Sequence, residues 1–174
     1  MELFQMSLFQ MSTFKLSLVS ATLLCSWVAG FLFSFAVVAM PGLGQLGDRD
    51  FIRAFQVIDG VIQKNQPIFM AVWLGSIVTL IASAVLGFQQ LSGANRLLLI
   101  GAAVIYLFGV QLPTITGNIP LNNQIQATDV QQLDAAGLAQ ARSSFEPRWN
   151  RLNVFRTILA ALASGILVLL VLRL

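Results

Sequence analysis

The sequence predicts an all-α fold, a four-helix transmembrane bundle, and three observations lead to this prediction. Of 174 residues, 57% are hydrophobic and only 10% are charged, whereas a soluble domain usually has about 25% charged residues. Four long stretches carry no ionisable side chain, and each is close to the roughly 20 residues that cross a bilayer. These stretches leave no other segment from which a soluble core could form. We therefore expect residues 1–174 to form a single membrane domain in a lipid bilayer.

The expected spans lie at about residues 18–40, 67–89, 96–112 and 153–172, after an N-terminal tail of residues 1–16. The first two are long enough as they stand, whereas the other two reach sufficient length only with flanking polar residues. The first span follows Lys15, as a cleaved signal peptide would. Its apolar part is about twice the usual signal-peptide core, so we expect it to be retained.

The first long connection has the pattern of an amphipathic helix. Between residues 48 and 64, one face of a helical wheel carries Phe51, Phe55, Ile58 and Ile62. Polar and charged residues lie opposite, and Asp59 falls at the edge of the apolar face. This spacing predicts a helix lying at the membrane interface.

The last long connection contains two helix-breaking signals and one helix start. Two prolines and a glycine in residues 113–123 predict irregular backbone after the third span. Thr128 and Gln131 have the spacing of a capping box. They predict a short polar helix that ends before Pro147.

Small residues recur at every fourth position in the spans, and such stripes let helices approach closely in lipid. The stripes comprise Thr22, Ser26, Gly30 and Ser34, then Gly75, Thr79, Ser83 and Gly87, and finally Ala161 and Gly165. We interpret them as packing seams.

The charge distribution indicates an orientation. Seven basic residues belong to the long connections and three to the side of the termini. Because basic residues favour the cytoplasmic side, we expect an integral, multi-pass protein with its long loops in the cytoplasm.

Composition also excludes several functions. The chain has no histidine and one cysteine, Cys25, which excludes a His-ligated haem, a His-containing zinc or iron site, a Ser-His-Asp triad and an intrachain disulfide. We expect no metal and no cofactor. A net charge of +3 that is scattered along the chain does not indicate nucleic acid as a partner.

A candidate site follows from polar residues at the membrane edge. Asn150, Asn153 and Arg156 recur at a spacing of three, and an arginine at membrane depth normally faces the bundle or a wet cavity. Residues 113–123 would face them with a second group of polar side chains, Thr114, Thr116, Asn118 and Asn122. Gln56 and Asp59 could close the site from the amphipathic segment. Alternatively, all these groups only tie the loops together by hydrogen bonds and salt bridges.

Three blocks of sequence resemble those of a known family. The first is Met40-Pro41-Gly42-Leu43, followed by Phe51, Phe55-Gln56-x-Ile58-Asp59, Ile62 and Asn65-x-Pro67-x-Phe69. The second is Gly101 and Tyr106-x-x-Gly109, leading into Thr114-x-Thr116-x-Asn118-Ile119-Pro120-Leu121-Asn122. The third is Arg148-Trp149-Asn150-Arg151-x-Asn153-x-x-Arg156. On these blocks, which span about residues 17–172, the chain resembles the DUF1772 (anthrone oxygenase-like) membrane proteins.

The resemblance implies a four-helix membrane protein, and fungal members of the family oxidise anthrones to anthraquinones with oxygen. Metal-free chemistry on an aromatic enol or quinol would need a base, an oxyanion stabiliser and an apolar slot. Asp59, which stands where the family usually has Asn, would be the base, made stronger by desolvation beside Phe55. Arg156 or Arg148 would hold the oxyanion with Asn118 and Asn122, and Trp149 and Tyr106 would stack on the rings. Gln56, Thr114 and Asn153 would complete the binding site for a hydrophobic aromatic or quinone ligand.

A non-enzymatic function is the alternative to the oxygenase. A small bundle with small-residue seams is equally compatible with an accessory subunit, or with a lipid- or quinone-binding protein in a larger membrane complex. Function must be argued from the site rather than from the fold.

Overall fold

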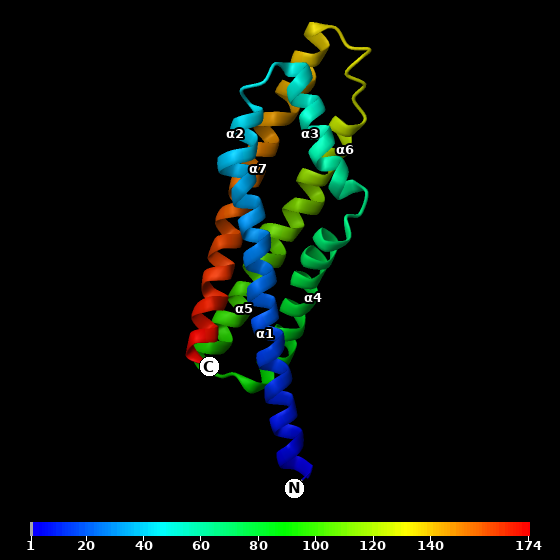
Figure 1. The fold of residues 1–174 in the computed structure, drawn as a ribbon. Helices are drawn as coiled ribbons and strands as arrows, with labels where there is room; N and C mark the ends of the chain where they lie inside the picture. The colour runs from blue at the N-terminus through cyan, green and yellow to red at the C-terminus, as the bar shows by residue number, and fades with distance from the viewer. Residues whose placement is uncertain (1) are drawn as a thin grey trace.

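The described chain forms an elongated bundle of membrane-length helices (Figure 1). The computed structural model describes the backbone of residues 2–174 and the side chains of residues 13–174, so the side chains of the predicted tail up to residue 12 lie outside it. Over this part of the chain, four helical stretches are long and apolar enough to cross a membrane: Thr13–Leu43, Pro67–Gln90, Gly93–Gln126 and Ala135–Arg173. The predicted all-α transmembrane bundle is confirmed, and the chain is an integral, multi-pass membrane protein.

The first two spans are joined through a shorter helix. The first span consists of α1 (Glu2–Ser34), a π-helical turn η1 (Phe35–Ala39) and α2 (Met40–Leu43) in direct succession. Helix α3 (Asp48–Gln63) follows, and the second span is α4 (Pro67–Gln90).

Helix α3 buries a different set of residues from the one that the helical wheel selected. Phe51, Ile52, Phe55 and Asp59 are buried, whereas Ile58 is 38% exposed. Asp59 is accommodated because amide side chains of α6 donate hydrogen bonds to its carboxylate. The buried face of α3 is therefore part of the protein core.

The third span contradicts the expectation of irregular backbone between residues 113 and 123. Helix α5 (Gly93–Tyr106) continues through π-helical turns η2 (Leu107–Gln111) and η3 (Thr114–Asn118) into α6 (Ile119–Gln126). The prolines are tolerated because Pro113 immediately precedes η3 and Pro120 immediately follows the first residue after η3, so both lie beside a π-helical turn, where the regular hydrogen-bond ladder is already interrupted.

The last connection also differs from the prediction. Helix α7 (Ala135–Arg173) begins at Asp134, whose side chain accepts a hydrogen bond from Gly137 N at 2.8 Å. It continues through Pro147 into the fourth span, so no separate short helix ends before this proline. Phe145 and Trp149, on either side of Pro147, are buried in one cluster and keep the helix continuous. The predicted capping box is replaced by a local turn in which Gln131 N donates to Asp129 Oδ1 at 2.9 Å.

Within residues 13–174, buried apolar side chains form two clusters. One cluster joins α1, α4, α5 and α7 and includes Phe14, Leu99 and Leu167. The other joins α3, α6 and α7 and includes Phe55 and Trp149. The candidate site described below lies where the two clusters meet, since its walls include residues of both.

The small-residue stripes are only partly packing seams. In α4, Ser83 and Gly87 are buried, and Ser83 Oγ lies 2.6 Å from Ser17 Oγ of α1. In α1 and α7, no atom of residues 13–174 lies within 4 Å of the position that a Cβ atom would take at Gly30 or Gly165. The packed small residues of these helices are instead Ala21, Cys25, Ala160, Ala163 and Ser164.

The two chain ends and the α4–α5 link lie at one end of the bundle, and the long connections lie at the other (Figure 1). Lys15 Nζ donates to the backbone oxygen of Leu174 at 3.1 Å, which joins α1 to the end of α7. The long connections lie together at the opposite end of the bundle, next to the candidate site (Figure 1).

Candidate functional site

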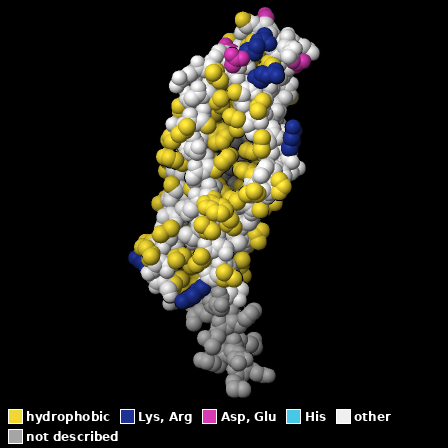
Figure 2. All heavy atoms as spheres, viewed as in Figure 1, with side chains coloured by type: hydrophobic (Ala, Val, Ile, Leu, Met, Phe, Trp, Pro, Cys, Tyr) yellow, Lys and Arg dark blue, Asp and Glu magenta, His cyan; other side chains and the backbone are white. Residues whose placement is uncertain are grey.

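The site is a cavity of about 320 Å³ near the long-connection end of the bundle. Its walls come from α1 and η1, α3, α4, the η2–η3–α6 stretch and α7. Aromatic side chains line much of it: Trp27, Phe31, Phe69 and Trp73. Figure 2 shows the face over α1, α3 and α4 covered by hydrophobic side chains along its middle, with charged side chains mostly towards its ends. The volume is in the range of small-molecule sites, roughly 300–1,000 Å³.

Arg156 is the cation of this cavity. It belongs to α7 and is only 4% exposed. Its Nη1 donates to Thr114 Oγ1 at 2.8 Å and its Nη2 to Asn153 Oδ1 at 3.0 Å, while Nε has no partner among the described residues. Among the side chains described, no carboxylate lies within ion-pair distance of it. A buried guanidinium with neutral partners and a spare donor favours an anionic or strongly accepting ligand.

Asp59 is the carboxylate of the same cavity. It is buried on α3, and its oxygens accept hydrogen bonds from Asn122 Nδ2 at 2.7 Å, Gln63 Nε2 at 2.8 Å and Gln126 Nε2 at 2.9 Å. A carboxylate offers about four acceptor positions. The three amide donors therefore leave room for one further proton-bearing group.

Asn122 and Trp149 connect the two charges. Asn122 donates to Asp59 and accepts from Trp149 Nε1 at 2.8 Å. The guanidinium carbon of Arg156 lies 6.0 Å from the centre of the Trp149 ring. A continuous line of side chains thus runs from the carboxylate to the cation along one wall.

The asparagines predicted for the site line the same cavity. Asn153 Nδ2 donates to the backbone oxygen of Leu32 at 3.1 Å, which ties α7 to α1. Asn118 Nδ2 makes a 3.4 Å contact with the backbone oxygen of Trp149, and within the part of the chain that the structure describes its Oδ1 has no partner. Thr114, Asn118, Asn122, Asn153 and Arg156, together with Asp59 and Trp149, are all brought together.

The structure places the remaining predicted residues elsewhere. Gln56 Nε2 donates to the backbone oxygens of Ile125 and Thr128, which holds α3 against the end of α6. Tyr106 is buried behind the cavity wall, with its hydroxyl 2.7 Å from Ser76 Oγ. Arg148 is exposed on α7.

Sequence reasoning missed two polar residues of the cavity, Gln111 and Trp73. Trp73 Nε1 donates to Gln111 Oε1 at 2.8 Å across the boundary between α4 and η2. The signal that could have revealed the pair is a glutamine inside an otherwise apolar span, since a polar side chain at that depth needs a partner. Across residues 13–174, no three His, Cys, Asp or Glu side chains gather closely enough to hold a metal ion.

This architecture defines a class: a multi-pass helical membrane protein with an internal cavity that is aromatic over much of its wall and carries a guanidinium and a carboxylate. The family model described as Anthrone oxygenase matches residues 68–166, more than half of the chain. The chain therefore belongs to the anthrone oxygenase (DUF1772) family. Comparisons with curated proteins and with solved structures found no match.

Proposed function

We propose that the protein is a cofactor-independent oxygenase that converts an anthrone-like aromatic enol into the corresponding quinone. In this reaction one ring CH₂ group and one O₂ give a carbonyl group and one water. The substrate would enter from the lipid phase, since the mouth of the cavity carries exposed apolar side chains such as Trp27 and Ile68. Family membership and the paired charges of the cavity support this proposal.

The observation that carries the proposal is the environment of Arg156. Removing a proton from the CH₂ group of an anthrone places negative charge on the oxygen across the ring. A preorganised donor at that oxygen stabilises the charge as it develops. Arg156 offers a buried cation and an Nε–H without a partner in residues 13–174, and Asn118 also lines the cavity.

Asp59 supplies the base in this scheme. The amide donors around it suit the ionised carboxylate, which accepts but does not donate hydrogen bonds. Asp59 takes a proton from the CH₂ group, and the resulting enolate adds O₂ at that carbon to give a peroxide anion. Asp59 returns its proton to the peroxide, and loss of water breaks the O–O and remaining C–H bonds to leave the second carbonyl.

Trp149 positions the rings. It lines the cavity between the two charges and is packed at 5.5 Å and 5.6 Å, centre to centre, against the rings of Phe55 and Phe35. We assign stacking to Trp149 and not to Tyr106, and the oxyanion to Arg156 and not to Arg148, because only the first of each pair lines the cavity.

The test uses the full chain in phosphatidylcholine nanodiscs with anthrone under air. We expect anthraquinone to form above the rate in empty nanodiscs, with one O₂ consumed per quinone. Asp59→Asn removes the base and should lower the rate by about 10²–10⁴-fold. Arg156→Met keeps the apolar stem and should lower it by about 10²–10³-fold.

Arg148→Met is the matched control, because it removes an exposed arginine from the same helix and should leave the rate unchanged. Wild-type protein that turns over anthrone no faster than empty nanodiscs would refute the proposal. Full activity in both cavity variants would refute the assigned roles.

A further inference from the structure

The two oxygens of the Asp59 carboxylate have different surroundings. Oδ2 accepts hydrogen bonds from Gln63 Nε2 at 2.8 Å and from Gln126 Nε2 at 2.9 Å. Within the described chain, Oδ1 accepts one hydrogen bond, which Asn122 Nδ2 donates at 2.7 Å. Each carboxylate oxygen offers about two acceptor positions. The acceptor position that is left for a ligand therefore belongs to Oδ1.

Oδ1 is also the oxygen on the cavity side. Asp59 and its donor Asn122 line the cavity, whereas Gln63 and Gln126 lie outside its wall. Gln63 is exposed and Gln126 is half-buried, so the two donors to Oδ2 come from the solvent side of the contact between α3 and α6. The carboxylate thus directs Oδ2 away from the cavity and Oδ1 towards a ligand.

Asn122 holds Oδ1 through an amide whose orientation is fixed from both sides. An indole N–H can only donate, so the amide oxygen of Asn122 must be the atom 2.8 Å from Trp149 Nε1. An ionised carboxylate can only accept, so the NH₂ group of the same amide must face Asp59. Both polar ends of Asn122 therefore hold neighbouring side chains in place.

We infer that Asn122 is a positioning residue, which holds Asp59 Oδ1 against a ligand stacked on Trp149, and that Oδ1 is the oxygen that takes the ligand's proton. This inference rests on the proposed function and deepens it. The proton moves from the CH₂ group to Oδ1, and the electron pair of the broken C–H bond stays on the ligand as the enolate. A ligand with an O–H group donates a hydrogen bond to the same oxygen. The cavity is therefore selective for aromatic ligands that present such a hydrogen.

The competing role is purely structural, with Asn122 serving only to tie α6 to α3 and α7. Both roles predict that loss of the amide lowers thermal stability. They differ in ligand selectivity, because a structural tie affects hydrogen-bond donors and their non-donating analogues equally. They also differ in kinetics, since only misplacement of Oδ1 lowers kcat while KM stays the same.

Binding is measured by equilibrium dialysis of the full chain in phosphatidylcholine nanodiscs, with empty nanodiscs to subtract partition into lipid. The ligands are 2-naphthol and 2-methoxynaphthalene. They share the aromatic rings and an acceptor oxygen, but only 2-naphthol can donate a hydrogen bond. Wild type is compared with Asn122→Leu, and with the smaller Asn122→Ala in case the first variant does not fold.

We expect wild-type protein to bind 2-naphthol about tenfold more tightly than 2-methoxynaphthalene, because a hydrogen bond to a carboxylate is charge-assisted. In either Asn122 variant this ratio should fall below about threefold, since a carboxylate held through Oδ2 alone can rotate. With anthrone under air, the same variants should lower kcat by about tenfold to a hundredfold and leave KM within about twofold.

The matched control is Gln56→Met. Gln56 Nε2 donates to the backbone oxygens of Ile125 at 2.8 Å and Thr128 at 2.9 Å, so it ties α3 to the end of α6 and makes no hydrogen bond to Asp59. Its loss should lower thermal stability and leave both the selectivity and kcat within about twofold of wild type.

Unchanged selectivity in the Asn122 variants, or an equal loss in Gln56→Met, would overturn the inference, as would wild-type protein without selectivity. These results are separable from failure of the proposed function. Selectivity that depends on Asn122 without any turnover of anthrone would leave the inference standing and refute the oxygenase. Turnover with wild-type selectivity and wild-type kcat in Asn122→Leu would do the reverse.

Discussion

Gly87 and Gly30 belong to similar small-residue stripes in the sequence, yet their surroundings differ. A Cβ atom at Gly87 would collide with Leu99 Cδ2 and would lie 2.7 Å from Phe14 Cε2. Both neighbours are fully buried and cannot move aside easily. At Gly30, no atom of the described residues lies within 4 Å of the same position. Close helix packing therefore depends on the residue across the interface, which the stripe itself does not reveal.

At this scale we predict that Gly87→Ala lowers stability by about 1–3 kcal/mol, because it overpacks a filled interface. Gly30→Ala is the control. It should be neutral or stabilise by up to about 1 kcal/mol, since alanine favours a helix interior. Thermal unfolding in nanodiscs checks both, and a Gly87→Ala protein as stable as wild type would contradict the packing argument.

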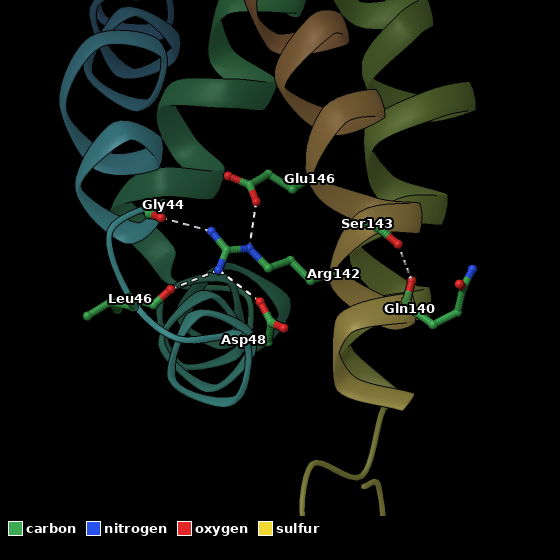
Figure 3. A network of polar contacts seen from close by, with 7 residues as sticks. All are labelled: Gly44, Leu46, Asp48, Gln140, Arg142, Ser143 and Glu146. Carbon is green, nitrogen blue, oxygen red and sulfur yellow. Dashed lines mark hydrogen bonds and ion pairs between the residues drawn. The ribbon is translucent and has the colours of Figure 1, made fainter. Parts of the chain in front are cut away.

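Helix α7 is the element that joins the long connections to the membrane core. Figure 3 shows Arg142 of α7 reaching the loop between α2 and α3. It donates to Gly44 O at 2.9 Å, Leu46 O at 2.8 Å and Asp48 Oδ1 at 3.1 Å, and its Nε lies 2.7 Å from Glu146 Oε2. Its guanidinium also lies 4.3 Å from the centre of the Phe51 ring. One side chain thus fixes the start of α3, which carries Asp59 into the cavity.

At the element scale we predict that Arg142→Met lowers stability by about 2–3 kcal/mol, because charge-assisted hydrogen bonds to a loop and a cation–π contact are lost together. Arg151→Met is the control, since Arg151 is exposed on the same helix and should change stability by less than about 0.5 kcal/mol. Thermal unfolding of the two variants measures the difference. Equal stability of Arg142→Met and Arg151→Met would show that the loop does not need this anchor.

The described chain is polar at its two ends and apolar between them (Figure 2). The long axis of the bundle therefore runs across the bilayer, with the polar ends in water. The sequence places more basic residues at the long-connection end than at the end with the termini. Arg156 must be removed from that comparison, because it is buried in the cavity. Six basic residues against three still favour long connections in the cytoplasm.

At the molecular scale we predict opposite labelling of single cysteines at Ser92 and Gln124, which are exposed at opposite ends of the bundle. Cys25 is buried and is the only native cysteine, so it should contribute no background. A membrane-impermeant maleimide should modify Ser92→Cys in intact cells and Gln124→Cys only in inverted vesicles. The reverse pattern would invert the orientation, and labelling of both from one side would refute the topology.

The sequence by itself determined the class of fold, because uncharged stretches of membrane length require helices wherever no water can satisfy the backbone. It also selected the polar groups at the cavity, since Asn118, Asn153 and Arg156 are too costly at membrane depth to face lipid. The helix boundaries depended on tertiary packing, which keeps α7 continuous through Pro147. Only the tertiary structure placed Gln111 on the cavity wall, with Tyr106 behind it and Arg148 outside it. The physical reason is that spacing assigns a residue to a face of its own helix, whereas the elements packed against that face decide what the residue meets.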